Sequence, residues 1–194
     1  MCIRDRHYAE TIERETSRLR RLVDDLLDFG RVERDLPLRI ERQEVELESW
    51  LEAFAARERS RCHEARCSLS LELDDLPPRA FLDTDAIERA LATLLDNARK
   101  HSGSESIRLV ARGGEKGRLD FEVIDRGRGT KSAAFEDLFQ PFARASETGG
   151  TGLGLSIVRA IAEAHGGSAQ LVEGADGTGL RAVVSVDASQ QEAA

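Results

Sequence analysis

A glycine-rich segment that runs directly into an apolar helix constrains this sequence more than any other feature. Four glycines fall within residues 149–154, and apolar residues at helical spacing follow over residues 155–165 until Gly166 and Gly167 end the pattern. Glycine lets a backbone turn freely and lets it approach a ligand closely. Because the unpaired N–H groups at a helix N-terminus attract anions, the segment indicates a phosphate site.

Two common phosphate-binding schemes do not fit the spacing of this segment. A Walker-type loop requires Lys and then Ser or Thr directly after its last glycine, but Leu155 follows Gly154. A dinucleotide-binding fingerprint requires a glycine three residues past Gly154, where the chain has Ile157. Phosphate would therefore be bound by another scheme, and a flexible loop before a packing helix stays the alternative.

The composition of the chain is that of a folded acidic domain. Its 194 residues are 40% hydrophobic, and its net charge of −8 argues against a non-specific nucleic-acid binder. Cys2, Cys62 and Cys67 lack the paired spacing of a zinc site, so a reduced cytosolic setting is expected. No apolar run approaches the roughly 20 residues of a membrane span, so we expect no membrane contact by these residues.

The N-terminal part reads as one long helix over residues 8–34. Ile12, Leu19 and Leu26 recur every seven residues, with Leu22 and Phe29 offset by three, which predicts a coiled-coil or bundle helix. An ordinary amphipathic helix that packs on its own domain is the alternative. The pattern breaks near residue 36, so we expect a partial helical unit over 1–35, a domain over 36–188 and a frayed tail over 189–194.

Both secondary-structure periods occur after this break. Alternation predicts strands over residues 38–45, 67–73, 106–112, 119–125, 168–173 and 179–186, and helical spacing predicts helices over 47–61, 86–101 and 155–165. A short helical or irregular stretch, 132–144, precedes the glycine-rich segment. Helices mixed with strand hairpins predict an α+β fold, a two-layer α/β sandwich with the helices on one face of the sheet.

Polar side chains stand at two further places where ligand chemistry is expected. Asn97 and Lys100 end the predicted helix 86–101, and Asp125 ends a predicted strand beside Gly127 and Gly129. A carboxylate accepts a hydrogen bond from an exocyclic amine, and the two glycines permit close approach of a flat ring. An amide oxygen suits Mg²⁺, and a lysine neutralises phosphate charge.

The order of these motifs resembles the catalytic, ATP-binding domain of two-component sensor histidine kinases, within the wider Bergerat-type ATPase superfamily. Residues 94–101 are similar to the N box of that family, 125–129 to its G1 box, 139–144 to its F box and 149–155 to its G2 box. The resemblance covers roughly residues 36 to 187 and implies a mixed sheet. The helix over 8–34 resembles the second helix of the family's dimerisation and phosphotransfer domain.

The resemblance implies a role for each candidate site residue. Asn97 would bind Mg²⁺, Lys100 would contact phosphate and Asp125 would recognise the adenine amine. His101 would pack on the adenine, and Arg144 would orient the terminal phosphate or meet the phosphotransfer helix. The further residues expected at the nucleotide are Gly127, Gly129, Gly150, Thr151, Gly152, Leu153, Gly154 and Leu155. Asn97 as a satisfied polar helix residue and Asp125 as a turn former are the alternatives.

Some positions depart from the family pattern. Thr93 stands where another Asn is frequent, Thr130 replaces an aliphatic residue, and Leu180 replaces a threonine that supports the adenine site. The stretch between Phe142 and the G2 box is short. The phosphoacceptor histidine box of the family is also missing, so we expect a fragment that binds ATP but lacks its own acceptor.

The first hypothesis is therefore the kinase portion of a sensor histidine kinase, which transfers the γ-phosphoryl group of ATP to a histidine with the help of Mg²⁺. Its implied partners are a histidine-containing dimerisation domain, as a homodimer in the parent protein, and a response regulator receiver domain. The implied location is the cytoplasm, with membrane anchoring of the parent left open. The alternatives are a nucleotide-sensing or partner-binding module without kinase activity and an anti-sigma type serine kinase.

Overall fold

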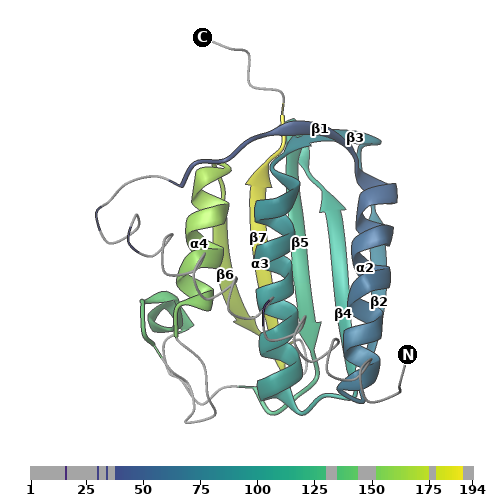
Figure 1. Cartoon of the computed structure of the whole chain (residues 1–194), viewed down its shortest axis with the longest axis vertical. Helices are drawn as coiled ribbons and strands as arrows, with labels where there is room; N and C mark the ends of the chain where they lie inside the picture. The colour runs from purple at the N-terminus through teal and green to yellow at the C-terminus, as the bar shows by residue number, and fades with distance from the viewer. Residues whose placement is uncertain are drawn as a thin grey trace.

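The computed structural model describes residues 38–129, 135–143, 152–174 and 178–189, together with the single residues 16, 30 and 34. The predicted helix over 8–34 lies almost wholly outside the described residues, as does the tail 190–194, and the domain boundary near residue 36 stays a prediction. The described chain forms a layer of helices on a layer of strands (Figure 1). This arrangement confirms the predicted α+β two-layer sandwich.

A five-stranded mixed sheet forms one layer. In sheet order its strands are β2 (Ser68–Asp74), β4 (Ser106–Gly113), β5 (Arg118–Asp125), β7 (Leu180–Asp187) and β6 (Ser168–Glu173). The pair β2 and β4 is parallel, while the other three pairs are antiparallel. The 3₁₀ turn η2 (Glu115–Gly117) joins β4 to β5. The parallel pair is the one whose connection is long, because it passes through β3 (Arg79–Leu82) and α3 (Thr84–Asn97).

Three helices cover one face of this sheet (Figure 1). They are α2 (Leu47–Glu64), α3 (Thr84–Asn97) and α4 (Gly154–Ala164). Alternate strand residues point toward the helices, and Phe121 of β5 lies fully buried among them. Its ring meets that of Trp50 from α2 edge to face, with ring centroids 6.2 Å apart. The core therefore lies between the two layers.

The opposite face of the sheet carries charged side chains. Glu122 of β5 is only 2% exposed there, because Arg112 from β4 and Arg181 from β7 flank it. One of its carboxylate oxygens lies 2.6 Å from Nη2 of Arg181. Ion pairs across neighbouring strands thus cover part of the sheet face that lies opposite the described helices.

A second, two-stranded sheet differs from the prediction. The strand expected over residues 38–45 is β1 (Gln43–Glu46), and it pairs antiparallel with β3 (Arg79–Leu82), which the sequence analysis did not predict. The residues just before β1 are not part of the strand and form hydrogen bonds elsewhere. The Glu41 amide, for example, donates to the Asp83 carboxylate at 2.8 Å. A strand of four residues directly after two prolines is too short to show a clear period.

Helix α3 begins and ends differently from its predicted bounds. Asp83 caps its N-terminus by accepting a hydrogen bond from the Ala86 amide at 2.9 Å, so the helix begins at Thr84. At the other end it passes into a π-helical turn, η1 (Ala98–Ser102). The backbone amide of Asp83 also donates to Nε2 of the buried His165, at 3.3 Å, which ties the end of α4 to the start of α3.

Candidate functional site

The end of the N-box helix touches the turn after β5. The Arg128 amide donates to the Ser102 carbonyl at 3.1 Å. A Cβ placed on Gly127 would lie 2.1 Å from the same carbonyl oxygen, so only glycine fits there. The structure thereby supplies a second reason for Gly127 besides approach to a ligand: it allows the two motifs to lie against each other.

The N-terminus of α4 also packs against α3. Gly154 is the first residue of α4, and a Cβ on it would lie 2.9 Å from the Cγ2 methyl of Thr93. Thr93 precedes Asn97 by one helical turn, so both lie on the same side of α3. The fold therefore brings the glycine segment, the end of α3 and the end of β5 together, as the motif order led us to expect.

Asp125 lies at the centre of this arrangement. It is 7% exposed, and its Oδ1 accepts a hydrogen bond from the Gly127 amide at 2.8 Å. Burial raises the pKa of this carboxyl above its ordinary value, although backbone hydrogen bonds from Gly127 and Leu180 lower it in part. The backbone of Leu180 thus supports Asp125 even though its side chain departs from the family pattern.

Gly179 is a site residue that the sequence analysis did not single out. Its φ is +72°, and an added Cβ would lie 2.0 Å from the Asp125 carbonyl oxygen. A side chain there would push β7 away from the end of β5. The available signal was the glycine that begins the predicted strand 179–186, but a glycine in that place also fits an ordinary turn.

The candidate phosphate end of the site lies at the end of α3. The Asn97 side chain is half-buried and makes no hydrogen bond to any residue that the structure describes, so its amide is open to a ligand. The Lys100 ammonium pairs with the Asp96 carboxylate one turn earlier, and the Lys100 side chain is 54% exposed. Both groups can therefore turn toward a bound phosphate.

A magnesium ion fits this donor set. Within the described ranges no group of three or more His, Cys, Asp or Glu side chains could hold a metal on its own. Mg²⁺ prefers oxygen and usually takes few protein ligands when it bridges phosphates. The open amide oxygen of Asn97 together with phosphate oxygens meets that preference.

The described part of the glycine segment anchors α4. Gly152 has a φ of +73°, and its carbonyl accepts a hydrogen bond from the Phe142 amide at 2.9 Å. Leu153 is buried, and its carbonyl accepts a hydrogen bond from the Ser156 hydroxyl at 2.7 Å. Leu155 packs partly buried against the core. The two ends of the intervening stretch, at Phe142 and Gly152, are therefore held side by side.

The 3₁₀ helix η3 (Phe135–Phe139), which leads into the F box, is fixed to α4 by an arginine. Arg159 of α4 lies over the ring of the buried Phe139, with its Cζ atom 4.2 Å from the ring centroid. The same guanidinium pairs with Glu136 at 2.7 Å, and both partners belong to η3 (Phe135–Phe139). The helical or irregular stretch predicted over 132–144 thus contains a 3₁₀ helix at Phe135–Phe139, and the described residues 140–143 after it are not helical.

Several predicted site residues lie outside the described residues. They are Arg144, Gly150, Thr151 and the side chain of His101, and the neighbouring Thr130 lies outside as well. Gly129 is described and has a φ of +65°, a conformation that favours glycine. The structure therefore brings together Asn97, Lys100, Asp125 and the described glycines, and the roles of the others stay predictions.

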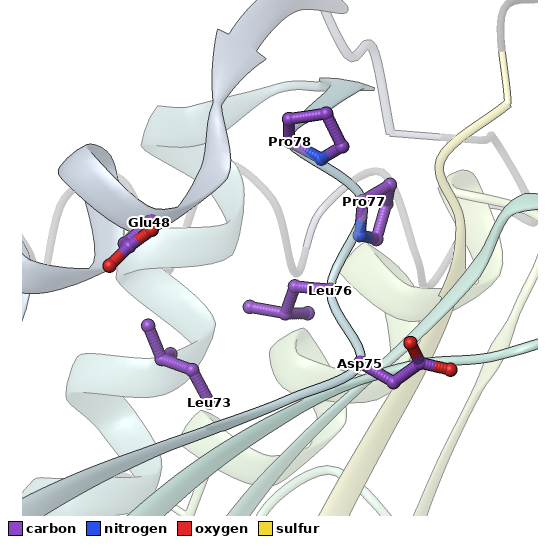
Figure 2. A pocket seen from close by; sticks show the side chains of 6 residues that line it. All are labelled: Glu48, Leu73, Asp75, Leu76, Pro77 and Pro78. Atoms are coloured by element: carbon purple, nitrogen blue, oxygen red, sulfur yellow. The ribbon is translucent and has the colours of Figure 1, made fainter.

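A shallow hollow elsewhere on the molecule does not belong to this site. It has a volume of about 200 Å³ and is lined by Glu48, Leu73, Asp75, Leu76, Pro77 and Pro78 (Figure 2). These residues come from the start of α2, the end of β2 and the loop before β3 (Figure 1). Asn97, by contrast, is the last residue of α3. The volume of the hollow is smaller than that of typical small-molecule pockets and does not suit a nucleotide.

Comparison with known proteins gives consistent matches. Residues 82–190 match the family described as Histidine kinase-, DNA gyrase B-, and HSP90-like ATPase. The alginate biosynthesis sensor protein KinB of Pseudomonas aeruginosa is 35% identical over 166 residues, which cover 84% of this chain and 28% of KinB. The probable sensor histidine kinase TcrY of Mycobacterium tuberculosis is 34% identical, over 84% of this chain and 34% of TcrY.

A solved structure matches the whole chain. Full-length ShkA in complex with AMPPNP superposes with a TM-score of 0.77 at 25% identity, covering 100% of this chain and 41% of that one. The chain therefore spans less than half the length of each of these three proteins. No helix in the described part of the chain has the length and apolar character needed to cross a membrane.

Proposed function

Because this chain belongs to the family of histidine kinase-, DNA gyrase B- and HSP90-like ATPases, we propose that it is the ATP-binding catalytic part of a sensor histidine kinase. The observation that carries the proposal is that the turn directly after Asp125 packs on η1, where the backbone of Gly127 lies against Ser102. This contact supports the proposal, because Asp125 would accept from the adenine amine while Asn97, just before η1, and Lys100, within it, would meet Mg²⁺ and phosphate.

At the adenine end the chain supplies a fixed acceptor. Backbone amides of Gly127 and Leu180 hold the Asp125 carboxylate, so it is oriented before a ligand arrives. A carboxylate accepts a hydrogen bond from the exocyclic amine of adenine, whereas the carbonyl oxygen at the same place on guanine offers no donor. Asp125 would thereby select ATP over GTP.

At the phosphate end the chain supplies charge and orientation. Asn97 would hold Mg²⁺ against the phosphates, and Lys100 would leave Asp96 to neutralise a phosphate oxygen. Phosphoryl transfer depends mainly on such positioning and neutralisation of charge. The acceptor imidazole nitrogen would then bond to the γ-phosphorus as the bond to the β–γ bridging oxygen breaks and ADP leaves.

The proposal extends to the partners of the site. The acceptor would be a histidine of a dimerisation domain in a homodimeric parent protein, and the phosphoryl group would pass on to a response regulator receiver domain. The site would face the cytoplasm, where ATP and receiver domains meet it. These partners rest on the family resemblance and on the sensor-kinase names of the relatives.

Calorimetric titration with ATP tests the proposal. We expect ATP to bind in the presence of Mg²⁺ and to bind more weakly when EDTA removes the ion. Asn97→Ala should reduce the affinity for MgATP at least about tenfold, because it deletes the proposed protein ligand of the metal. If the variant binds MgATP as tightly as the wild type, with the same dependence on Mg²⁺, Asn97 does not hold the ion and the proposed site is wrong.

A further inference from the structure

A glutamate occupies the apolar stripe of α2. The buried residues of this helix are Leu47, Leu51, Phe54, Ala55, Glu58 and Cys62, which recur at helical spacing on one side. Glu58 is only 2% exposed. A carboxylate that leaves water is destabilising unless a charge and hydrogen bonds compensate it. The buried Glu58 carboxylate therefore needs a positively charged partner.

Arg99 is the buried partner of this carboxylate. Its Nη1 lies 2.8 Å from Oε2 of Glu58, and the Arg99 side chain is 9% exposed. Arg61 takes the other oxygen of Glu58 but is itself 54% exposed. The Arg99 Nη1 also lies 3.7 Å from the Cys62 sulfur. Burial lowers the pKa of Arg99, but hydrogen bonds to Glu58 and Cys62 outweigh this and its pKa is raised.

The position of Arg99 in the chain links this buried pair to the nucleotide site. Arg99 lies in the π-helical turn η1, between Asn97 and Lys100. Its Nη2 lies 3.6 Å from Oδ1 of Asp96, while the other oxygen of Asp96 pairs with Lys100. A continuous series of charged contacts thus runs from Glu58 in α2 through Arg99 and Asp96 to the Lys100 ammonium.

A π-helical turn is rare and occurs mostly as a single turn, frequently at functional sites, which fits the place of η1 directly after Asn97. The Glu58 contact comes from a different helix, 41 residues earlier in the chain, and fixes η1 from its buried side. A buried ion pair adds little net stability over a well-packed apolar pair, so stability alone does not explain it. What such a pair does provide is one defined direction for the groups it holds.

We propose that Glu58 and Arg99 are positioning residues for the phosphate end of the nucleotide site. They hold η1 and Asp96 so that Asn97 and Lys100 face the phosphates of ATP, and they make no contact with the nucleotide themselves. This inference rests on the proposed function, because it assigns the phosphate contact to Lys100. It predicts an effect on ATP that is absent for adenosine, which has no phosphate.

The chain offers a closely matched control for Glu58. Glu122 is also 2% exposed and also lies between two arginines, Arg112 and Arg181, but on the face of the sheet opposite to the helices. Glu58→Gln and Glu122→Gln remove the same charge from equally buried sites. If the role of Glu58 were purely structural, the two variants would have the same ratio of MgATP affinity to adenosine affinity.

The experiment compares affinities for MgATP, by calorimetry, and for adenosine, by NMR titration, at a temperature where each variant is folded. Glu58→Gln should weaken the affinity for MgATP about five- to tenfold and change the affinity for adenosine by less than about twofold. Glu122→Gln should lower the melting temperature but leave the ratio of the two affinities unchanged. An unchanged ratio in Glu58→Gln, or an equal change in Glu122→Gln, overturns the inference.

Two further variants complete the test. Arg99→Lys keeps a charge beside Glu58 but loses the second guanidinium nitrogen that faces Asp96, so it should weaken MgATP selectively even if Glu58→Gln does not fold. In a Lys100→Ala background, Glu58→Gln should have little additional effect, because both changes act through the same ammonium. If the losses of MgATP affinity from the two changes are fully additive in the double variant, Glu58 does not act through the Lys100 ammonium. Absence of MgATP binding by the wild type would instead refute the proposed function itself.

Discussion

Asp125 shows how a single residue can favour binding at the expense of stability. Burial raises the pKa of its carboxyl above the ordinary 3.8, despite hydrogen bonds from Gly127 and Leu180. Protonation of Asp125 therefore stabilises the folded protein relative to the unfolded chain. The associated stability is fully present below the ordinary pKa and is lost as the pH rises through the raised value. The ionised carboxylate consequently lowers the stability of the folded protein.

Asp125→Asn is expected to separate these two effects. Its amide oxygen can still accept from the backbone, but its NH₂ group faces the adenine amine with a donor, so ATP affinity should fall about ten- to a hundredfold. Removal of the buried charge should raise the melting temperature at pH 7 by about 2 to 4 °C. Calorimetric titration and thermal unfolding measure the two changes.

The pH dependence of the wild type provides the control. As the pH falls through the raised pKa of Asp125, the wild type should lose ATP affinity while the difference in melting temperature from Asp125→Asn shrinks. A variant that binds ATP normally, or that unfolds at a lower temperature than the wild type at pH 7, would contradict this account of Asp125.

Among the elements, the packing of α3 against α4 determines how the glycine segment meets the N box. Gly154 begins α4 with no Cβ, and the Thr93 methyl of α3 fills the adjacent space at 2.9 Å from an ideal Cβ position. The Thr93 hydroxyl donates to the Arg89 carbonyl at 2.9 Å, which holds the methyl in place. The departure from the family pattern at Thr93 therefore has a packing role.

Gly154→Ala should destabilise the protein by about 1 to 2 kcal/mol, because its methyl meets that of Thr93. Thr93→Ser removes the opposing methyl and keeps the hydroxyl, so the double variant should recover most of the loss. Alanine also lowers the entropy of the unfolded chain relative to glycine, which assists the recovery. Urea denaturation of the two single variants and the double variant measures the coupling, and additive losses would exclude a direct contact.

The elements themselves were largely predictable from the sequence. The helices α2, α3 and α4 and all five strands of the main sheet lie close to their predicted ranges, because each has a clear period of buried residues. The strand β3 was missed because four residues cannot establish a period. The π-helical end of α3 was also not predicted, since such turns are rare and no residue period marks them.

The motifs indicated the residue types of the candidate site but not its supporting contacts. They named Asn97, Lys100 and Asp125, whose roles at a nucleotide stay predictions. Periodicity alone could not show that Gly179 packs on the backbone of Asp125, nor that a glutamate in an apolar stripe has its partner on another helix. Such contacts join distant segments, so they appear only when the fold places the segments together.

At the scale of the whole molecule, the two faces of the sheet have different roles. The face under the helices holds the apolar core, and the opposite face is covered by the ion pairs around Glu122. The candidate site lies at the edge between α3, α4 and the end of β5, where three motifs far apart in the sequence meet.

The most direct test of this account is phosphoryl transfer in trans. The chain is mixed with Mg²⁺, ATP labelled at the γ-phosphate and a separate histidine-kinase dimerisation domain that carries an acceptor histidine. We expect acid-labile, alkali-stable label on that domain, which is lost when its histidine is changed to alanine or when this chain carries Asn97→Ala. Binding of MgATP with no transfer to any of a panel of such domains would contradict the kinase assignment and indicate a nucleotide-sensing module instead.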